Sequence, residues 1–247
     1  MIFLFKKKPI VLDCFVTSEN IAQTAPITNA IRHIPEWWKK LPNKVYPENT
    51  IHPTPTMKKC EGMFDYYNKS VAIPLWADLA IDIKEGGFYN WQFSDFATEA
   101  GIHDQSQRGD FLPEHTYGHL KIHNPWSCRT KENIDWVFSC PTYNYEQPER
   151  LIIAPGILNF KLQPSLSINM FLNVSKPKRF IVPFGQVLAH LTPMSDRPVD
   201  VRRHVITKQE MDQIQSVSAA TTFTGMFRSQ VKAKEKFKDC PYTGGFK

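Results

Sequence analysis

The chain has 247 residues, of which 42% are hydrophobic and 13% aromatic, so it can bury a sizeable core and wholesale disorder is excluded. Its 30 basic and 24 acidic residues give a net charge of +6, which at first suggests a nucleic-acid partner. The excess charge lies in residues 1–8 and 228–247 and the remainder is nearly neutral, so we expect no more than weak nucleic-acid binding by these basic tails.

The start of the chain places apolar side chains before three lysines, which is the reverse of the order in a secretory signal. No window approaches the roughly 18 uncharged apolar residues of a membrane span. The five cysteines lie at long spacings without a Cys-x-x-Cys pair, so the sequence supports neither a zinc ribbon nor a thioredoxin-type site, and nothing in it demands an oxidising compartment. We therefore expect a soluble, intracellular protein that is not secreted and has no membrane partner.

Residues 1–58 are expected to begin with a strand and a short helix. Ile10–Val16 is apolar and rich in β-branched residues, which is typical of a strand. Glu36–Leu41 is expected to form a helical turn that a proline ends. The adjacent Trp37 and Trp38 cannot both face inward on one turn, so one of them is expected in a groove or at a contact.

The segment that follows, residues 42–58, holds four prolines and few regular apolar positions. Because proline fixes φ and lacks an amide donor, this pattern indicates an extended connection laid across a surface. Val71–Ile83 alternates apolar and other residues at its end, which favours a strand, while Pro74 demotes its first half to an edge or a bulge.

Residues 59–206 are predicted to form a β core. Short strand-like runs follow one another without long helices between them, which favours an antiparallel sandwich or jelly-roll, with a double-stranded β-helix as one form of it, over a parallel α/β fold. The expected strands are Tyr89–Phe93, Gly118–His123, Asp135–Cys140, Arg150–Ala154, Ser167–Val174, Arg179–Val182 and Gln186–Thr192.

Residues 207–247 change to a helical pattern that ends in a basic tail. Thr207 and Glu210 have the spacing of a capping box, which predicts a helix start. A second helical stretch is expected at about residues 226–237. The whole chain, residues 1–247, is therefore expected to be a single, mainly β domain with a short N-terminal helix and C-terminal helices.

A histidine-rich stretch carries the most suggestive chemistry in the sequence. If residues 119–123 form a strand, His119, Lys121 and His123 share one of its faces. Mononuclear non-haem iron sites are commonly built from two histidines and one carboxylate. The candidate metal ligands are His103, His119 and His190, with Asp104, Glu114 and His123 as alternates.

Lys121 or Arg197 could anchor an acidic co-substrate beside such a centre, which would then use Fe(II) with 2-oxoglutarate. The usual His-x-Asp or His-x-Glu pair is absent, because Lys121 stands two residues after His119. The alternative is that these histidines make hydrogen bonds on a polar face of the sheet. No residue is assigned a catalytic role by the sequence.

Several other classes of site are not supported. The chain lacks Gly-x-Gly-x-x-Gly and Gly-x-x-x-x-Gly-Lys, so nucleotide motifs are excluded, and it also lacks Gly-x-Ser-x-Gly and His-Glu-x-x-His. Large aromatic residues in a β-rich chain are more often core than ligand platform. The tryptophans expected in the core are Trp76, Trp91, Trp126 and Trp136.

An ordered set of six stretches carries a family resemblance. The stretches are Phe5–Pro9, Ile34–Pro42, Lys59–Gly62, Ile73–Asp78, His119–Trp126 and Pro183–Pro193. Together they resemble an uncharacterised family of marine tailed phages, chiefly large contractile-tailed phages of cyanobacteria, and more distantly bacterial domains of unknown function. The resemblance implies a phage protein with one mostly β domain, located in the cytoplasm of the infected host cell or in the virion.

Two functions follow as hypotheses. The first is a mononuclear iron oxygenase of the 2-oxoglutarate type on a β jelly-roll, because of the histidine stretch. The second is a non-enzymatic virion component or partner-binding adaptor, because of the paired tryptophans, the proline segment and the basic ends, which commonly order on a partner. The partner, a small molecule or a protein, is not identified by the sequence, and an oligomer is compatible with it.

Overall fold

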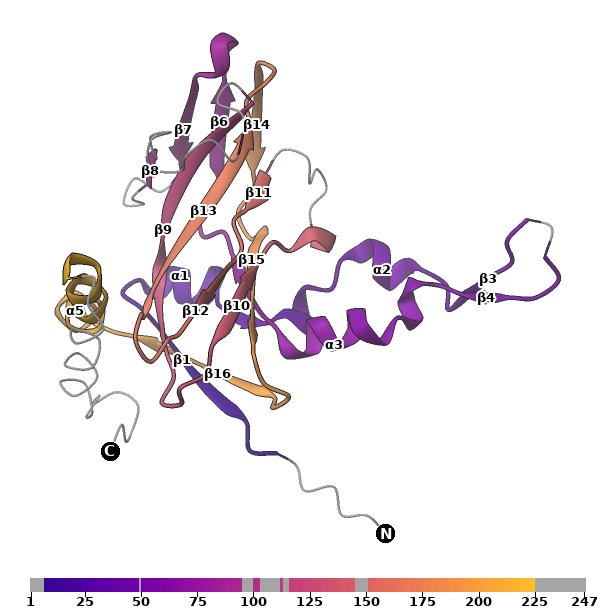
Figure 1. The fold of residues 1–247 in the computed structure, drawn as a ribbon, viewed down its shortest axis with the longest axis horizontal. Coiled ribbons are helices and arrows are strands. Elements are labelled where there is room, and N and C mark those ends of the chain that lie inside the picture. The colour runs from indigo at the N-terminus through magenta and orange to yellow at the C-terminus, as the bar shows by residue number, and fades with distance from the viewer. Residues whose placement is uncertain are drawn as a thin grey trace.

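The computed structural model describes residues 7–48, 50–94, 100–102, 112, 116–144 and 151–224. These residues form a β-sandwich with helices on both outer faces, as Figure 1 shows. The mainly β class predicted from the short strand-like runs is therefore confirmed. In the described ranges, no helix combines the length and the hydrophobicity that a membrane span requires.

The first sheet of the sandwich is built around β9. Its strands run in the order β11 (Leu151–Ile153), β13 (Ser165–Asn173), β9 (Tyr117–Arg129), β1 (Ile10–Val16) and β16 (Val199–Val205), with β8 (Ala100–Ile102) also paired to β9. Strand β1 pairs antiparallel with β9 but parallel with β16. The predicted antiparallel pattern therefore has one exception, and it joins two strands far apart in the sequence.

The second sheet faces the first across the core. Its order is β12 (Gly156–Leu158), β10 (Trp136–Ser139), β15 (Val187–Pro193), β5 (Val71–Pro74) and β2 (Thr28–Asn29). A third sheet, of β14 (Lys178–Val182), β6 (Leu79–Ile83) and β7 (Tyr89–Phe93), extends one end of the sandwich. Strand β5 ends at Pro74 and lies between β15 and β2. The irregularity predicted at Pro74 is present as a shift in the pairing register between β5 and β15, at Val187 and Ala189.

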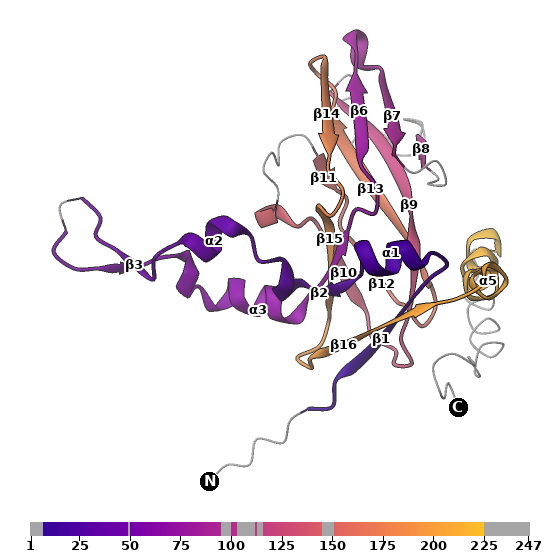
Figure 2. The ribbon, with the colours of Figure 1, turned by 180° about the vertical axis from the view of Figure 1, so that it is seen from behind.

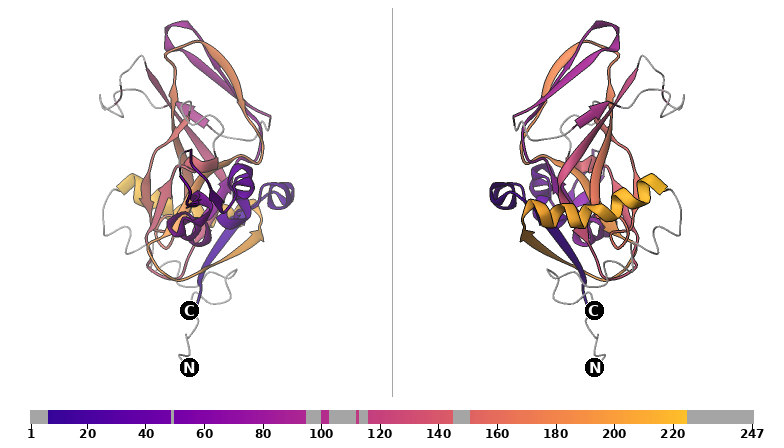
Figure 3. Two further views of the ribbon diagram at one scale, coloured as in Figure 1. Left: turned by 90° about the vertical axis from the view of Figure 1, so that its right-hand side faces the viewer. Right: turned by 90° about the vertical axis from the view of Figure 1, so that its left-hand side faces the viewer.

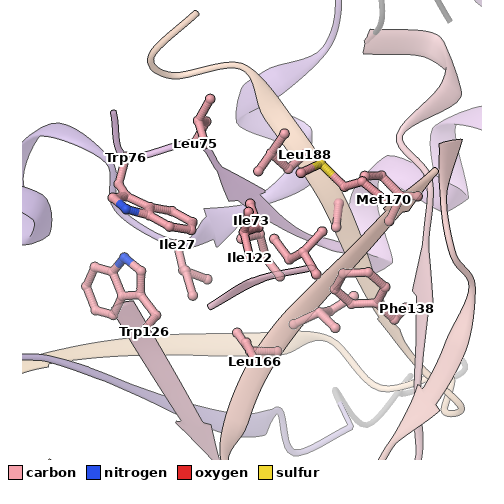
Figure 4. Packing of buried hydrophobic residues seen from close by; sticks show 14 of the residues in the cluster. Ile27, Ile73, Leu75, Trp76, Ile122, Trp126, Phe138, Leu166, Met170 and Leu188 are labelled. Carbon is pink, nitrogen blue, oxygen red and sulfur yellow. The ribbon is translucent and has the colours of Figure 1, made fainter. Parts of the chain in front are cut away.

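Alternation along the strands fills the space between the two main sheets. In β9, Leu120, Ile122 and Trp126 are buried. The alternate residues His119, Lys121 and His123 face outward. One cluster of buried apolar side chains takes members from both sheets. In Figure 4, Trp76 and Trp126 lie at one end of this cluster with Ile27 beside them. The predicted core tryptophans are buried, except Trp91, which is half-buried against the cluster.

Two helices pack beside β1, one against the core cluster and the other on the outer side of the sheet. Helix α1 (Glu19–Thr24) begins at Ser18, whose side chain accepts a hydrogen bond from the backbone N–H of Ile21. Helix α5 (Lys208–Thr224) lies across the first sheet (Figure 3). The predicted capping box is present, because Thr207 Oγ1 accepts from the Glu210 N–H and Glu210 Oε2 accepts from the Thr207 N–H. The second predicted helix, residues 226–237, lies outside the described residues.

The other face of the sandwich carries a helical platform. It consists of η1 (Ala30–His33), α2 (Glu36–Lys40), η2 (Met57–Lys59) and α3 (Glu61–Lys69), which pack on β5 and β15. Between α2 and η2 the chain forms a hairpin of β3 (Lys44–Val45) and β4 (Thr54–Pro55) that projects from the molecule (Figures 1 and 2). The prediction that residues 42–58 lie across a surface is therefore wrong, since the segment leaves the surface.

Candidate functional site

The predicted histidine face on β9 is formed, but its side chains are already engaged. His119, Lys121 and His123 lie on the outward face, as the alternation predicted. His119 Nε2 is 3.2 Å from Asn169 Oδ1, and its ring lies 4.7 Å from the ring of Phe171 on the neighbouring strand. His123 Nδ1 is 3.3 Å from Ser167 Oγ. These contacts match the alternative in which the histidines bond on a polar sheet face.

The structure does not bring His190 to this face. His190 lies on β15, in the other sheet, and its side chain points outward against α3. His119 points outward from the first sheet, so the two imidazoles lie on opposite sides of a two-layer core, and packed sheets are about 10 Å apart. The predicted ligand set that combines them is therefore not formed. His103, Asp104 and Glu114 lie outside the described residues.

Two further observations concern the predicted iron and co-substrate site. Among the described residues, no three His, Cys, Asp or Glu side chains form a group that could hold a metal ion. Arg197 pairs with both carboxylate oxygens of Glu132 and also donates to the carbonyls of Lys8 and Pro9. Its guanidinium therefore clamps the chain ahead of β1 and is not free to anchor a co-substrate. The hydrogen bond from Arg197, together with its charge, lowers the pKa of Glu132.

The described surface of the chain has another candidate, the projecting hairpin. We call residues 42–56 the arm; Asn49 is not described. Every described arm residue from 42 to 55 is exposed, including Val45 at 40%, Tyr46 at 73% and Ile51 at 87%. Large apolar side chains exposed on one segment are typical of an interaction site. The arm is therefore the candidate functional site. The contacts at its base fix it to the rest of the molecule.

Trp38 anchors one end of the arm to the platform. Its side chain is only 4% exposed, and its ring stacks on Tyr67 with 5.6 Å between the ring centroids. Its Nε1 donates to the carbonyl of Met57, which joins the two segments that enter and leave the arm. Trp37 is 41% exposed and donates to the carbonyl of Tyr143. The prediction that only one of these tryptophans faces inward is confirmed.

The platform is fixed to the sandwich by a buried polar cluster. His190 Nδ1 is 2.7 Å from Tyr66 Oη, and both neighbouring tyrosine rings of α3 pack edge-on against the imidazole. Tyr67 Oη donates to Asn144 Oδ1 at 2.8 Å, and Asn144 Nδ2 donates to the carbonyl of His33 at 2.6 Å. These bonds tie α3 to the strand β15 beneath it and, through Asn144 in η4 (Thr142–Asn144), to η1.

Burial sets the protonation states in this cluster. It lowers the pKa of His190 to about 4, with a smaller contribution from the charge of His33, and it also lowers the pKa of His33. Burial raises the pKa of Tyr66 and Tyr67. At neutral pH the imidazole of His190 and both phenols are therefore uncharged, and Tyr66 can donate to the free Nδ1 of His190. The cluster holds the platform without placing a charge beneath it.

The helices α2 and η2 at the base of the arm are basic, whereas the arm itself has one lysine, Lys44, and one glutamate, Glu48. Residues 36–59 contain five lysines and two glutamates, which gives a net charge of +3. Glu36 pairs with Lys39 at 2.6 Å, and Lys58 donates to the carbonyl of Lys39. Each of these lysines, including Lys44 on β3, is exposed. Positive charge therefore lies at the base of the arm, in α2 and η2, and the arm itself has no net charge.

The sequence reasoning missed α3 and therefore the tyrosines that support the arm. Its signal was present but short: Met63 and Tyr67 are four residues apart, which is helical spacing, and both are buried. Nine residues with little other periodicity did not distinguish a helix from a loop. The role of His190 as a contact between layers could not be read from the sequence, because its partner, Tyr66, is 124 residues away.

Comparisons with models of protein families, with curated proteins and with solved structures found no match to this chain. The resemblance to tailed-phage proteins stays a prediction. Two of the six stretches that carry it, Ile34–Pro42 and Lys59–Gly62, lie at the base of the arm, and a third, Pro183–Pro193, includes His190.

Proposed function

We propose that this chain is a non-enzymatic partner-binding protein, an adaptor or a virion component of a phage, and that it attaches to a partner protein through the arm. The observation that carries the proposal is the high exposure of Tyr46 and Ile51 on a segment whose base is fixed by Trp38. An iron-dependent activity is not proposed, because His119 and His190 lie on opposite faces of the sandwich.

The described arm residues from 42 to 55 are exposed, so packing in the core does not explain why the arm is ordered. Its strands pair over two residues each, and such a hairpin is marginal in water on its own. Its prolines restrict the unfolded chain, and Thr56 closes its base by donating to the carbonyl of Pro42 at 2.5 Å. A segment held in one conformation pays less ordering entropy when it binds, which supports a role in recognition.

The chemistry of the arm describes the partner. Tyr and Ile side chains need an apolar pocket, and the lysines at the base of the arm favour acidic residues at its rim. We therefore propose a different protein with an acidic surface around an apolar hollow. Charge at the rim of an interface chiefly accelerates association, so binding is expected to weaken as salt is raised.

A short-arm variant tests the proposal. Replacing residues 46–53 with Asn-Gly leaves the Val45–Thr54 pair joined by a two-residue hairpin turn. In extracts of cells that produce the protein naturally, size-exclusion chromatography should show the wild type in a complex and the short-arm variant at its monomer mass. The matched control is Ile157→Ser with Ile181→Ser, two exposed isoleucines on sandwich strands, which should remain in the complex.

Two results would contradict the proposal. One is a wild type that elutes as a monomer in the extract, and the other is a short-arm variant that stays in the complex. Light scattering of the purified wild type shows whether the partner is a second copy of this chain or a different protein. A purified protein that dimerises through the arm would show that the partner is a second copy, and this would overturn the proposal of a different, acidic protein.

A further inference from the structure

A groove opens on the side of the sandwich away from the arm. It has a volume of about 900 Å³, at the upper end of the range of small-molecule sites, and lies where α1, α5, β9 and the β5–β6 and β14–β15 connections meet. Trp76, Asn124 and Phe184 line it. They belong to three of the stretches that carry the resemblance, although these stretches are far apart in the sequence.

The floor of the groove contains a polar group that lacks a partner. Asn124 is only 6% exposed, and its Oδ1 accepts a hydrogen bond from the Trp126 N–H at 2.8 Å. Its Nδ2 is buried and has no hydrogen-bond partner within the described part of the chain. A buried amide without an acceptor costs about 1–3 kcal/mol. A ligand that offers a hydroxyl or carbonyl oxygen to Asn124 would remove this cost.

Asp78 supplies an acceptor at the same groove. Its Oδ1 accepts from the Phe184 N–H at 2.7 Å, which holds the carboxylate, and its backbone N–H donates to Ser94 Oγ at 3.0 Å, which holds the backbone. Within the described residues, Asp78 Oδ2 accepts no hydrogen bond. The groove therefore presents a fixed donor and a fixed acceptor to whatever enters it.

Phe184 adds an apolar surface. It is 45% exposed and sits in the turn before β15, where Gly185 adopts a φ of 77°, in the left-handed region that glycine favours. Trp76, behind it, stacks on Phe93 with an interplanar angle of 9°. An exposed ring beside amide, carboxylate and hydroxyl groups suits a molecule that has a hydrocarbon face and several hydroxyls.

The charges of the groove exclude strongly anionic ligands. Lys208 is its one lysine and lies 3.8 Å from Asp212, while Asp78 would repel a phosphate. Other lining residues, such as Ser18, Asn20 and Ser165, are neutral hydrogen-bonding groups. From these observations we propose that the groove binds a neutral saccharide, with a sugar ring on Phe184 and its hydroxyls on Asp78 and Asn124.

Saturation-transfer NMR of the full chain tests the proposal with maltose, cellobiose and N,N′-diacetylchitobiose as probes. We expect saturable transfer to at least one of them and a loss of affinity of about fivefold in Phe184→Ala, the size of an aromatic contact. Asn124→Asp keeps the acceptor for Trp126 but removes the free donor, and should weaken the same sugar. The matched control is Phe88→Ala, a 75% exposed phenylalanine at the far tip of the β6–β7 connection, which should bind normally.

The proposal is overturned if none of the three sugars shows saturable transfer. It is also overturned if Phe184→Ala and Asn124→Asp, each verified as folded by its melting temperature, bind the sugar as the wild type does. Inorganic phosphate and AMP serve as anionic probes. Binding of either one in the groove, in place of the sugars, would show that the groove recognises an anion.

Discussion

His190 is a titratable side chain with no exposed surface, and its pKa is lowered to about 4. The unfolded chain takes up a proton on this histidine near pH 6.5, whereas the folded chain does not until about pH 4. The folded state is therefore fully stable above pH 6.5 with respect to this group and loses stability as the pH falls from 6.5 to 4. At about 1.4 kcal/mol for each pH unit, the loss is about 3 kcal/mol.

Replacing His190 with glutamine should remove this part of the pH dependence. Urea unfolding at pH 7.0 and pH 4.5 should show a difference in the free energy of unfolding that is smaller than in the wild type by about 2–3 kcal/mol. His52→Gln, on the exposed arm, is the control and should keep the wild-type difference. An unchanged difference in His190→Gln would mean that the histidine titrates normally when folded.

The cysteines differ in their access to reagents. Cys14 and Cys128 are fully buried, face each other across β1 and β9 and have their Sγ atoms 3.6 Å apart, whereas Cys60 is exposed. Burial and the neighbouring thiol raise the pKa of Cys14 well above its ordinary value. Because the thiolate is the reactive form, both buried thiols are expected to be inert in the folded protein.

Thiol labelling checks this expectation. In a Cys240→Ser background, which removes the cysteine outside the described residues, Ellman's reagent should modify Cys60 rapidly and Cys140 more slowly. Cys14 and Cys128 should react only at the rate of unfolding, and all four should react at once in guanidinium. Rapid labelling of either buried thiol in buffer would show that the β1–β9 pairing opens readily.

At the scale of elements, α2 offers a comparison of two adjacent tryptophans. Trp38→Ala removes a buried ring that stacks on Tyr67 and should lower the free energy of unfolding by about 3–5 kcal/mol. Trp37→Ala removes a partly exposed ring with one hydrogen bond and should cost less than about 1.5 kcal/mol. Urea titration of both variants measures the contrast. Equal losses would contradict the assignment of Trp38 as the anchor of the arm.

The strands were largely predictable because their signals are local. Ile10–Val16 and Tyr89–Phe93 match β1 and β7 residue for residue, since short apolar or alternating runs end there at turn residues. The capping box predicted α5 because both of its bonds lie within four residues. Strand β16 was missed, because its Val-Asp-Val-Arg-Arg-His sequence is mostly polar and its order comes from pairing with β1.

The candidate site was less predictable than the fold. The proline content of residues 42–58 indicated an extended segment, but its direction depends on Trp38 and α3, which pack through contacts between distant parts of the chain. The histidine stretch on β9 predicted a shared face correctly, yet a strand pattern does not say which sheet a distant residue such as His190 joins. Alternation within a strand predicts which of its residues share a face. Which sheet a strand joins, and which side of the core its residues then occupy, depends on the topology of the whole fold.

At the scale of the whole molecule, stability is expected to lie in the sandwich. The described arm residues from 42 to 55 bury little surface, so the short-arm variant loses almost no hydrophobic stabilisation. Its melting temperature should therefore stay within about 2 °C of the wild-type value, a shift that corresponds to about 0.5–1 kcal/mol in a domain of this size. Differential scanning calorimetry measures this. A large decrease would show that the arm contributes to the core.

The parallel pairing of β1 with β16 also bears on how the protein is made. Ile10 lies opposite Val199, so β1 must wait for a strand that emerges from the ribosome 189 residues later. Until then one edge of β1 stays unpaired on the ribosome, with Asp13 not yet bonded to His204 and Phe15 not yet covered by α5. Closing such a long loop is slow, and open strand edges invite aggregation. Completion of the sandwich is therefore a late event of biosynthesis, and the nascent chain is most vulnerable before it.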